Sequence, residues 1–452
     1  MKNQVLKNAM ILGASGIMAK SFDFAFRAFY SRSLGTEGMG LLSLGFGFHG
    51  VMLTVSTAGL GVAVSKVVSE YLEKKDYGAV RQCMKIAVYG VTCLSLLVIL
   101  LTLVSAEWIA GSILGDSRVA PSLCCLVPSI LFMGISYCLK GYFYAARKTI
   151  IPASSEFVEQ AVKCCIITLL LKWMLPRGIG YGCTAVFCGI SIGEFSSCLY
   201  LSLFFKKEAK KLRACTIRKG ILRSLVKISF PAMLTSLTGS SLRMQEEVWI
   251  VSAFKRFGMS HAEAISSLGM IHGMVMPMLV FPLTLAGSVT TLLVPEIARA
   301  NASANPKRLG RLVKKVYGFG LVAGCGVLLV FQLFSDQLSQ GIFHAPSIAP
   351  AVQRLSVLCP LMFLDSLSCA VLNGLGRQFS LLAYNLSDSF LRLLGIFVLV
   401  PRYGMPALLG VIAASNLFTC TLTMRKAIRN SGLIKSLEEF PGFKNFLRKR
   451  HV

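Results

Sequence analysis

The chain has 452 residues, of which 54% are hydrophobic and only 15% are charged. Soluble domains carry roughly 25% charged residues, so this composition excludes an ordinary soluble enzyme and predicts a polytopic membrane protein. The formal net charge of +27 does not indicate nucleic-acid binding, because the basic residues are spread over connections between apolar stretches, as in many membrane proteins.

Twelve apolar stretches are long enough to cross a bilayer, for which a helix needs about 20 residues. They lie approximately at residues 8–30, 40–69, 83–105, 119–145, 150–173, 181–205, 228–254, 265–297, 316–338, 349–374, 378–400 and 404–427. The expected fold is an all-α polytopic membrane protein with about 12 transmembrane helices. No cleavage signal follows the first stretch, so we expect it to remain as a signal anchor.

The positions of Lys and Arg predict the orientation of the chain. Of the 47 basic residues, 32 lie at the two ends or in the connections after every second stretch, and nine of these fall within residues 206–227. Basic connections stay in the cytoplasm. The pattern therefore predicts a multi-pass membrane protein with both termini in the cytoplasm.

The two halves of the sequence repeat one plan. An ungapped shift of 223 residues carries Gly16 to Gly239, Lys20 to Arg243, Asp23 to Glu246 and Gly35 to Gly258, and a shift of 229 carries Glu159 to Asp388 and Lys163 to Arg392. Such parallel repeats predict two pseudo-symmetric six-helix lobes around a central cavity. We expect an N-terminal lobe at residues 1–215, a C-terminal lobe at 216–430 and a basic cytoplasmic tail at 431–452.

The first stretch carries a stripe of small and charged residues along one helical face. Its members recur three or four residues apart: Gly13, Gly16, Lys20, Asp23 and Arg27. Charges inside a span are costly in lipid, so these must face protein or water. One interpretation is a partly neutralised cationic site for a diphosphate or an acidic sugar. The other is a salt-bridged triad that locks helices together.

The seventh stretch carries the symmetric set Arg243, Glu246 and Glu247, with the balance of charge reversed. This set could bind a coupling ion, hold the cations of the first stretch across the cavity, or serve as a plain lock. Further candidates for ion binding or gating occur in oppositely charged groups at helical spacing. They are Glu156, Glu159 and Lys163 in the fifth stretch, Asp388 and Arg392 in the eleventh, and Lys66 and Glu70 near the cytoplasmic end of the second.

Three charges stand alone in apolar sequence, namely Lys140, Glu194 and Asp365, and each is either functional or paired with an unidentified partner. Glycines and prolines within the spans could bend helices or permit close packing. They include Gly59, Gly61, Pro231, Pro277 and Pro282, and the last two interrupt one unusually long stretch, where we expect a kink.

Several segments resemble the polysaccharide flippases of the multidrug/oligosaccharidyl-lipid/polysaccharide (MOP) superfamily. The segments are YSRSLGTEGMGLLSL at 30–44, AGLGVAVSKVVSEY at 58–71, GYFYAARKTIIPASSEFVEQAVK at 141–163, LTLAGSVTTLLVPEIARA at 283–300 and LNGLGRQFSLLAYNLSDSFLR at 372–392. Within the superfamily the chain looks most like the stage V sporulation protein B type, related to lipid II flippases. Many relatives carry fourteen helices, and the last two have no counterpart in this sequence.

The motifs of other function classes are missing. The 15 cysteines contain no C-x-x-C, the five histidines form no H-E-x-x-H, and no G-x-x-x-x-G-K-[ST] exists for a nucleotide. We therefore expect no enzyme, metal or cofactor, and a coupling ion, Na⁺ or H⁺, in place of ATP.

The resemblance and the stripe together predict an alternating-access flippase. Its cargo would be a lipid-linked oligosaccharide or a polyprenyl-diphosphate sugar for cell-envelope or spore polysaccharide. Its partners would be this lipid-linked sugar and membrane lipids. We expect the protein to act as a monomer. Three alternatives are an ion-coupled multidrug extruder on the same fold, a membrane-embedded transferase and a non-transporting scaffold in envelope assembly.

Overall fold

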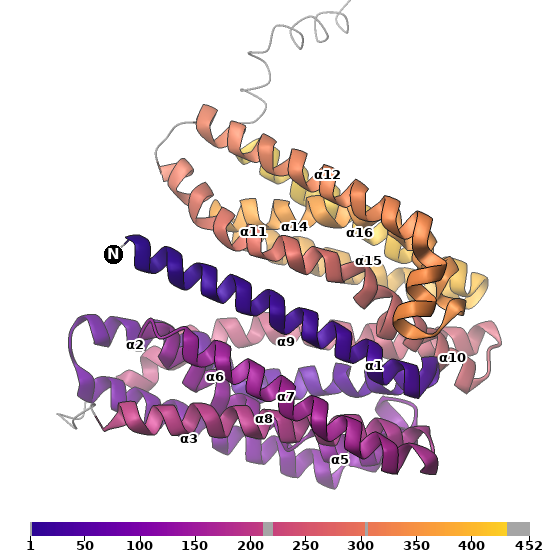
Figure 1. Cartoon of the computed structure of the whole chain (residues 1–452), viewed down its shortest axis with the longest axis horizontal. Helices are drawn as coiled ribbons and strands as arrows, with labels where there is room; N and C mark the ends of the chain where they lie inside the picture. The colour runs from indigo at the N-terminus through magenta and orange to yellow at the C-terminus, as the bar shows by residue number, and fades with distance from the viewer. Residues whose placement is uncertain (1, 211–219, 303–305, 432–452) are drawn as a thin grey trace, which may run out of the picture. The chain divides into compact units, whose positions relative to one another are not determined.

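A computed structural model describes residues 2–210, 220–302 and 306–431. The described residues fold into helices joined by short turns, as expected from their composition (Figure 1). The predicted basic tail begins at residue 431 and otherwise lies outside the described residues. The chain divides into two compact units, Met1–Met274 and Val275–Val452, and passes between them once.

The first unit holds nine longer helices. They are α1 (Lys2–Thr57), α2 (Leu60–Glu73), α3 (Tyr77–Val104), α5 (Ala120–Leu126), α6 (Ser129–Ala145), α7 (Ile150–Met174), α8 (Ile179–Ala209), α9 (Ile221–Phe257) and α10 (His261–Leu268). Shorter turns lie between them: α4 (Ala106–Trp108), η1 (Ile109–Ile113), η2 (Ser117–Val119) and η3 (Leu175–Arg177). α7 packs along α8, α2 along α6, and α1 along α9 and α10.

The second unit follows η4 (Gly269–Val275), which joins the two units, and repeats the order of the longer helices from α2 to α8. Its elements are α11 (Met276–Ala302), α12 (Pro306–Leu338), η5 (Ser339–Phe343), η6 (Pro346–Ile348), α13 (Ala349–Ser356), α14 (Cys359–Gly374), α15 (Gln378–Tyr403) and α16 (Met405–Ser431). α14 packs against both α12 and α16, and the three run side by side in Figure 1.

The twelve predicted spans all correspond to helices. By length and composition, seven of the described helices could cross a membrane, or nine if each bent pair, η2–α5 with α6 and η6–α13 with α14, is one span. One of the seven covers 58 residues from Gly16 to Glu73. At about 1.5 Å per residue it is long enough for two spans, and it turns at Gly35 (φ 66°). α7 and α9 are the remaining two: α7 carries several charges along its length, and α9 is rich in Ser and Thr as well as charged.

Turn geometry bears out the repeat that the sequence predicted. Gly35 and Gly258, which the shift of 223 pairs, both have positive φ, a conformation that glycine adopts without strain. The shift of 229 likewise pairs Arg147 with Gly376, both at positive φ. The fourth and tenth spans are both bent, by 41° and 59°. The lobe boundary predicted at residues 215 and 216 stays a prediction, because the compact units are divided at residue 274.

The long eighth stretch, where we expected a kink, contains a π-helix, η4. η4 interrupts the stretch just before Pro277, which lacks the N–H that a regular helix would need there. Gly59 also departs from helical geometry with a φ of 68°. Gly61 instead permits close packing, because a Cβ at this position would stand 3.2 Å from the Tyr137 carbonyl oxygen of α6.

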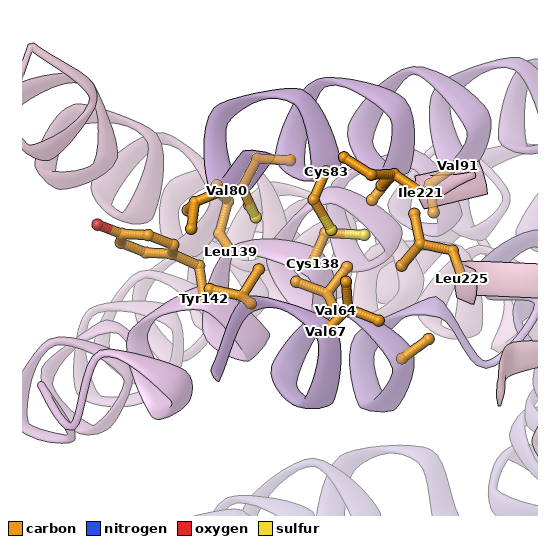
Figure 2. Close-up of a cluster of buried hydrophobic side chains, with 14 of the residues drawn as sticks. Val64, Val67, Val80, Cys83, Val91, Cys138, Leu139, Tyr142, Ile221 and Leu225 are labelled. Carbon is orange, nitrogen blue, oxygen red and sulfur yellow. The ribbon is translucent and has the colours of Figure 1, made fainter. Parts of the chain in front are cut away.

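Buried apolar side chains of α2, α3, α6, α8 and α9 form a hydrophobic cluster in the first unit. Figure 2 shows Val64 and Val67 of α2, Cys83 and Val91 of α3, and Leu139 of α6 packed together. Two residues of α9, Ile221 and Leu225, complete this cluster. Packing of this kind holds the helices that carry the candidate charges at fixed positions.

Candidate functional site

The charged stripe of α1 is joined to α7. The Asp23 carboxylate lies 3.1 Å from the Lys163 ammonium group, and the lysine side chain is only 11% exposed whereas the aspartate is 50% exposed. Asp23 therefore pairs with a residue 140 positions away and not with its own neighbours. Arg27 is half-buried near Tyr30 on the next turn of α1, while Lys20 is exposed.

This geometry combines parts of both sequence interpretations. A lock between helices exists, but it uses one acid of α1 and one cation of α7. Neither Lys20 nor Arg27 forms an ion pair with an acid among the described residues. The stripe therefore keeps two cations that are available to bind an anion, which is the chemistry that guanidinium and ammonium groups offer.

The acids of α9 face α1 and η4. The Glu246 carboxylate is buried and lies 4.0 Å from the His272 Nε2 of η4. Glu247 Oε2 packs against Gly47 of α1, where a Cβ would clash with it. Within the described ranges this oxygen is buried without a hydrogen-bond partner. Arg243 on the same helix is exposed.

A cavity of about 980 Å³ opens between α2, α6, α7 and α9 in the half of the unit that is predicted to face the cytoplasm. Lys66 and Glu70, the predicted gate residues, line it together with Lys140 and Glu156. The Lys140 ammonium group lies 3.3 Å from the Glu156 carboxylate. Lys140, which stood alone in the sequence, thus has a partner, and the cavity wall carries both signs of charge.

Behind this cavity, α7 and α8 pack closely around further acids. Gly193 of α8 leaves room for the backbone of α7, whose Glu159 carbonyl oxygen lies 3.2 Å from where a Cβ would stand. The Glu194 side chain is 8% exposed and lies near the Glu159 carboxyl of α7. Glu194, which stood alone in the sequence, is therefore close to a second acid in the folded chain.

The second unit holds its own charged cluster. The Asp388 carboxylate lies 3.4 Å from the Arg392 guanidinium one turn along α15. It accepts hydrogen bonds from Ser415 and, at 2.7 Å, from Thr419 of α16. Asp365, also alone in the sequence, accepts a hydrogen bond from Thr423 at 2.7 Å.

Four residues that the sequence did not single out meet at the predicted outer end of the first unit. Arg118 of η2 donates to Asp116 through its Nε and Nη2 atoms and lies 2.7 Å from Glu37 of α1. His261, at the start of α10, lies 3.1 Å from the same Asp116 carboxylate. We call these residues the outer cluster. No single stretch signalled them, because they come from three separate parts of the chain: Glu37 from α1, Asp116 and Arg118 from the turn at η2, and His261 from the start of α10.

The carboxylate of Asp116 is the centre of the outer cluster. Its side chain is 4% exposed, and burial alone would raise its pKa. Hydrogen bonds from the Arg118 side chain and backbone outweigh burial and hold the pKa of Asp116 below its ordinary value. The group is therefore ionised under physiological conditions and holds α10 to η2.

Close backbone packing accompanies the outer cluster. Gly269 of η4 lies against the Thr36 carbonyl and the backbone of Gly40, so that any side chain at this position would clash. Thr36 and Ser266 hydroxyls are hydrogen-bonded at 2.5 Å. α1 and the start of the eighth span are thus joined at their outer ends, while the cavity opens between helices at the other end.

No group of three or more His, Cys, Asp or Glu side chains within the described ranges is arranged to hold a metal ion. The described cysteines are free thiols.

Comparisons with known proteins agree with the resemblance seen in the sequence. The chain is 25% identical to stage V sporulation protein B of Bacillus subtilis over 92% of its own length and 82% of that protein. It is 22% identical to the lipid II flippase MurJ of the same organism, over 84% of this chain and 74% of that protein. It is 23% identical to the multidrug export protein MepA of Staphylococcus aureus, over 71% of this chain and 67% of that protein.

Solved structures share the fold. An inward-facing multidrug resistance MATE family transporter of the MOP superfamily superposes with a TM-score of 0.74 at 14% identity, covering 94% of this chain and 99% of that one. A second solved structure is a MOP superfamily transporter from Pyrococcus furiosus, described by the reversed polarity of its binding pocket. It superposes with a TM-score of 0.67 at 13% identity, covering 95% of this chain and 96% of that one. The profile of the polysaccharide biosynthesis protein family matches residues 5–301. The chain therefore belongs to the polysaccharide biosynthesis protein family of membrane transporters.

Proposed function

We propose that this protein is an alternating-access flippase of the bacterial cytoplasmic membrane with both termini in the cytoplasm. Its cargo is a lipid-linked oligosaccharide or a similar polyprenyl-diphosphate sugar, which moves from the inner to the outer leaflet for cell-envelope or spore polysaccharide. The family and the similarity to a lipid II flippase support this assignment.

The observation that carries the proposal is the pairing of Asp23 with Lys163. It removes the acid of the α1 stripe from contact with the stripe's own cations. Lys20 and Arg27 then take the diphosphate of the cargo, and the polyprenyl tail stays in lipid. Arg243 of α9, at the symmetric position of the repeat, adds a third cation to this site.

The first unit has the features expected of a state open to the cytoplasm. The outer cluster and the Gly269 packing close the outer ends of α1 and α10. The cavity with Lys66, Glu70 and Glu156 receives the head group from the cytoplasmic side. Export then requires the outer cluster to separate and the inner ends to approach one another.

The coupling ion binds at the acids of α9. A buried carboxylate oxygen without a hydrogen-bond partner is costly, and uptake of a proton or Na⁺ removes that cost. Glu247 has such an oxygen, with Glu246 beside it. Release of the ion leaves a negative charge that draws Arg27 of α1 toward α9. The carboxyl pair of Glu159 and Glu194 and the Asp388 cluster are further places for ion exchange.

The test is translocation by the purified protein in liposomes. A fluorescent polyprenyl-diphosphate sugar placed in one leaflet should move in the presence of a proton or sodium gradient. Lys20→Ala with Arg27→Ala should abolish this movement, and Lys20→Arg with Arg27→Lys should retain it. The matched control removes two cations from an outer connection, Lys172→Ala with Arg177→Ala, and should move the lipid at the wild-type rate. Unchanged transport by the first pair would show that the cargo site lies elsewhere.

A multidrug extruder is the second candidate, because the chain is similar to MepA and carries two adjacent acids on α9. A cationic drug would bind to the acids and not to the stripe. Drug efflux from the same liposomes that depends on Glu246 and Glu247 but not on Lys20 and Arg27 would favour this alternative.

A further inference from the structure

A second groove lies away from the charged sites, between α3, α6 and α8. Its volume is about 840 Å³. One end is lined by three cations, Arg81 and Lys85 of α3 and Lys206 of α8. Its remaining wall is largely apolar and includes Ile135 and Leu139 of α6. No acidic residue lines the groove, and none of the three cations forms an ion pair with another described residue.

Helical spacing places the cations and the apolar wall in one line. Arg81 and Lys85 are four residues apart, and Val88, Tyr89 and Thr92 continue the same face of α3 toward the middle of the helix. Lys206 lies one turn before the end of α8, which ends on the same side as α3 begins. The cationic end therefore lies near the cytoplasmic surface, in the orientation proposed above.

The floor of the groove is rigid and apolar. Leu139 belongs both to the groove wall and to the buried cluster of Figure 2. The ring of Phe205 in the groove wall meets Tyr142 edge-on at 5.0 Å between ring centroids. The nearest acid along α8, Glu208, is engaged with Lys148 at 2.6 Å and leaves the three cations unneutralised. The trough is thus preformed, with a net positive end.

We propose that this groove binds an anionic phospholipid of the inner leaflet. The phosphate lies among Arg81, Lys85 and Lys206, and one acyl chain follows the apolar wall past Ile135. Basic pockets between membrane helices on the cytoplasmic side are suited to such head groups. The general excess of basic residues in cytoplasmic connections accounts for cations at helix ends. It does not account for the convergence of two distant segments on a single apolar trough.

The occupant is a resident phospholipid and not the cargo. The groove shares no lining residue with the cavity that holds Lys66 and Glu156. A bound lipid would hold the inner ends of α3 and α8 together, on either side of the core that supports the transport site.

The experiment measures lipid retained by the purified full-length protein. The protein is reconstituted in nanodiscs of phosphatidylcholine with a minor fraction of phosphatidylglycerol, released, and analysed by native mass spectrometry. Arg81→Gln, Lys85→Gln and Lys206→Gln together should lower the affinity for phosphatidylglycerol on the order of a hundredfold, roughly fivefold for each cation. The matched control is Lys74→Gln, Lys75→Gln and Lys207→Gln, which removes equal charge at the same helix ends outside the groove and should retain the lipid.

A second variant fills the groove and keeps its charges. Ser202→Trp should also lose phosphatidylglycerol, with all three cations in place. Equal loss of phosphatidylglycerol in the triple variant of Arg81, Lys85 and Lys206 and in the control variant of Lys74, Lys75 and Lys207 would show general surface attraction and overturn the proposal. Retention of phosphatidylglycerol in the Arg81, Lys85 and Lys206 variant or in Ser202→Trp would overturn it too. Displacement of phosphatidylglycerol by an equimolar polyprenyl phosphate would make the groove a cargo site, contrary to the proposal.

Discussion

The outer cluster makes a quantitative prediction about how firmly α10 is held to the rest of the first unit. Asp116→Asn keeps the shape of the side chain but removes the charge that Arg118 and His261 contact. Breaking a buried, hydrogen-bonded ion pair costs about 3–5 kcal/mol. The Arg118 side chain is 43% exposed, however, and solvent screening lowers the expected cost to about 1–2 kcal/mol.

A loss of this size is about a tenfold increase in the population with α10 undocked. Hydrogen–deuterium exchange of the protein in nanodiscs measures it directly, because the amides of residues 260–268 exchange when α10 separates from α1 and η2. We expect about tenfold faster exchange in this segment and little change in α7. Glu107→Gln is the control, since this exposed acid lies in the same connection but outside the cluster.

Equal exchange in Asp116→Asn and the wild type would refute the reasoning, because it would mean that the cluster contributes nothing to docking. Faster exchange throughout the unit would also contradict it, since the cost would then fall on the whole fold and not on the attachment of α10.

Three further predictions concern stability, measured as the melting temperature in detergent by intrinsic fluorescence. The folded-state pKa of Asp116 lies below its ordinary value, so the stability that its carboxylate contributes is complete above about pH 4 and is lost as the pH falls through that lower pKa. The melting temperatures of the wild type and Asp116→Asn should therefore approach each other in acid. A constant difference in melting temperature down to pH 2 would contradict this. Gly269→Ala should destabilise the protein by about 1–3 kcal/mol, because the added methyl group clashes with the backbone of α1. Gly90→Ala is the control and should not destabilise it, because a methyl group there meets open space. Equal melting temperatures for the two variants would refute the packing argument. Thr419→Val should destabilise the protein by about 1.5–3 kcal/mol, because it removes a hydrogen-bond donor to the Asp388 carboxylate. Thr421→Val should destabilise it much less, because the Thr421 hydroxyl bonds only to the Leu417 carbonyl of its own helix. A larger loss of stability in Thr421→Val than in Thr419→Val would be evidence against this cluster.

The sequence was sufficient for the helices because each span is signalled locally. An apolar stretch of the required length predicts a membrane helix regardless of its neighbours. The repeat is visible in the turns as well, since Gly35 and Gly258, which the shift of 223 pairs, both have positive φ in the structure. These features depend on the chain within one or two turns, which is the range that a single sequence reports well.

The candidate site was less predictable because its partners are far apart in the chain. Asp23 gave no sign that its counter-ion is Lys163, 140 residues later, and the two competing interpretations of the stripe could not be separated without that contact. Lys140 and Asp365 stood alone in the sequence, yet Glu156 and Thr423 reach them from other helices. Which charges meet is decided by helix packing, and periodicity alone does not specify it.

The outer cluster shows the same limit most clearly. Glu37, Asp116, Arg118 and His261 come from three separate parts of the chain, and no two lie at a spacing that signals a site. The turn of η2 contains the only local hint, because Asp116 caps the backbone N–H of Arg118. The roles predicted for the intramembrane charges remain predictions that the transport experiments test.

The connection between the two compact units is placed inside a membrane span. The chain crosses from one to the other at Met274 and Val275, within η4 and two residues before Pro277. Most multidomain proteins bend at a hydrated linker, where water satisfies any backbone group that the motion exposes. Here a rearrangement would have to open and remake helix hydrogen bonds within the bilayer, where unsatisfied groups cost several kcal/mol. A flippase motion through this connection would therefore require water at the connection itself, so that a hydrated cavity would serve the movement of the helices as well as the passage of the cargo.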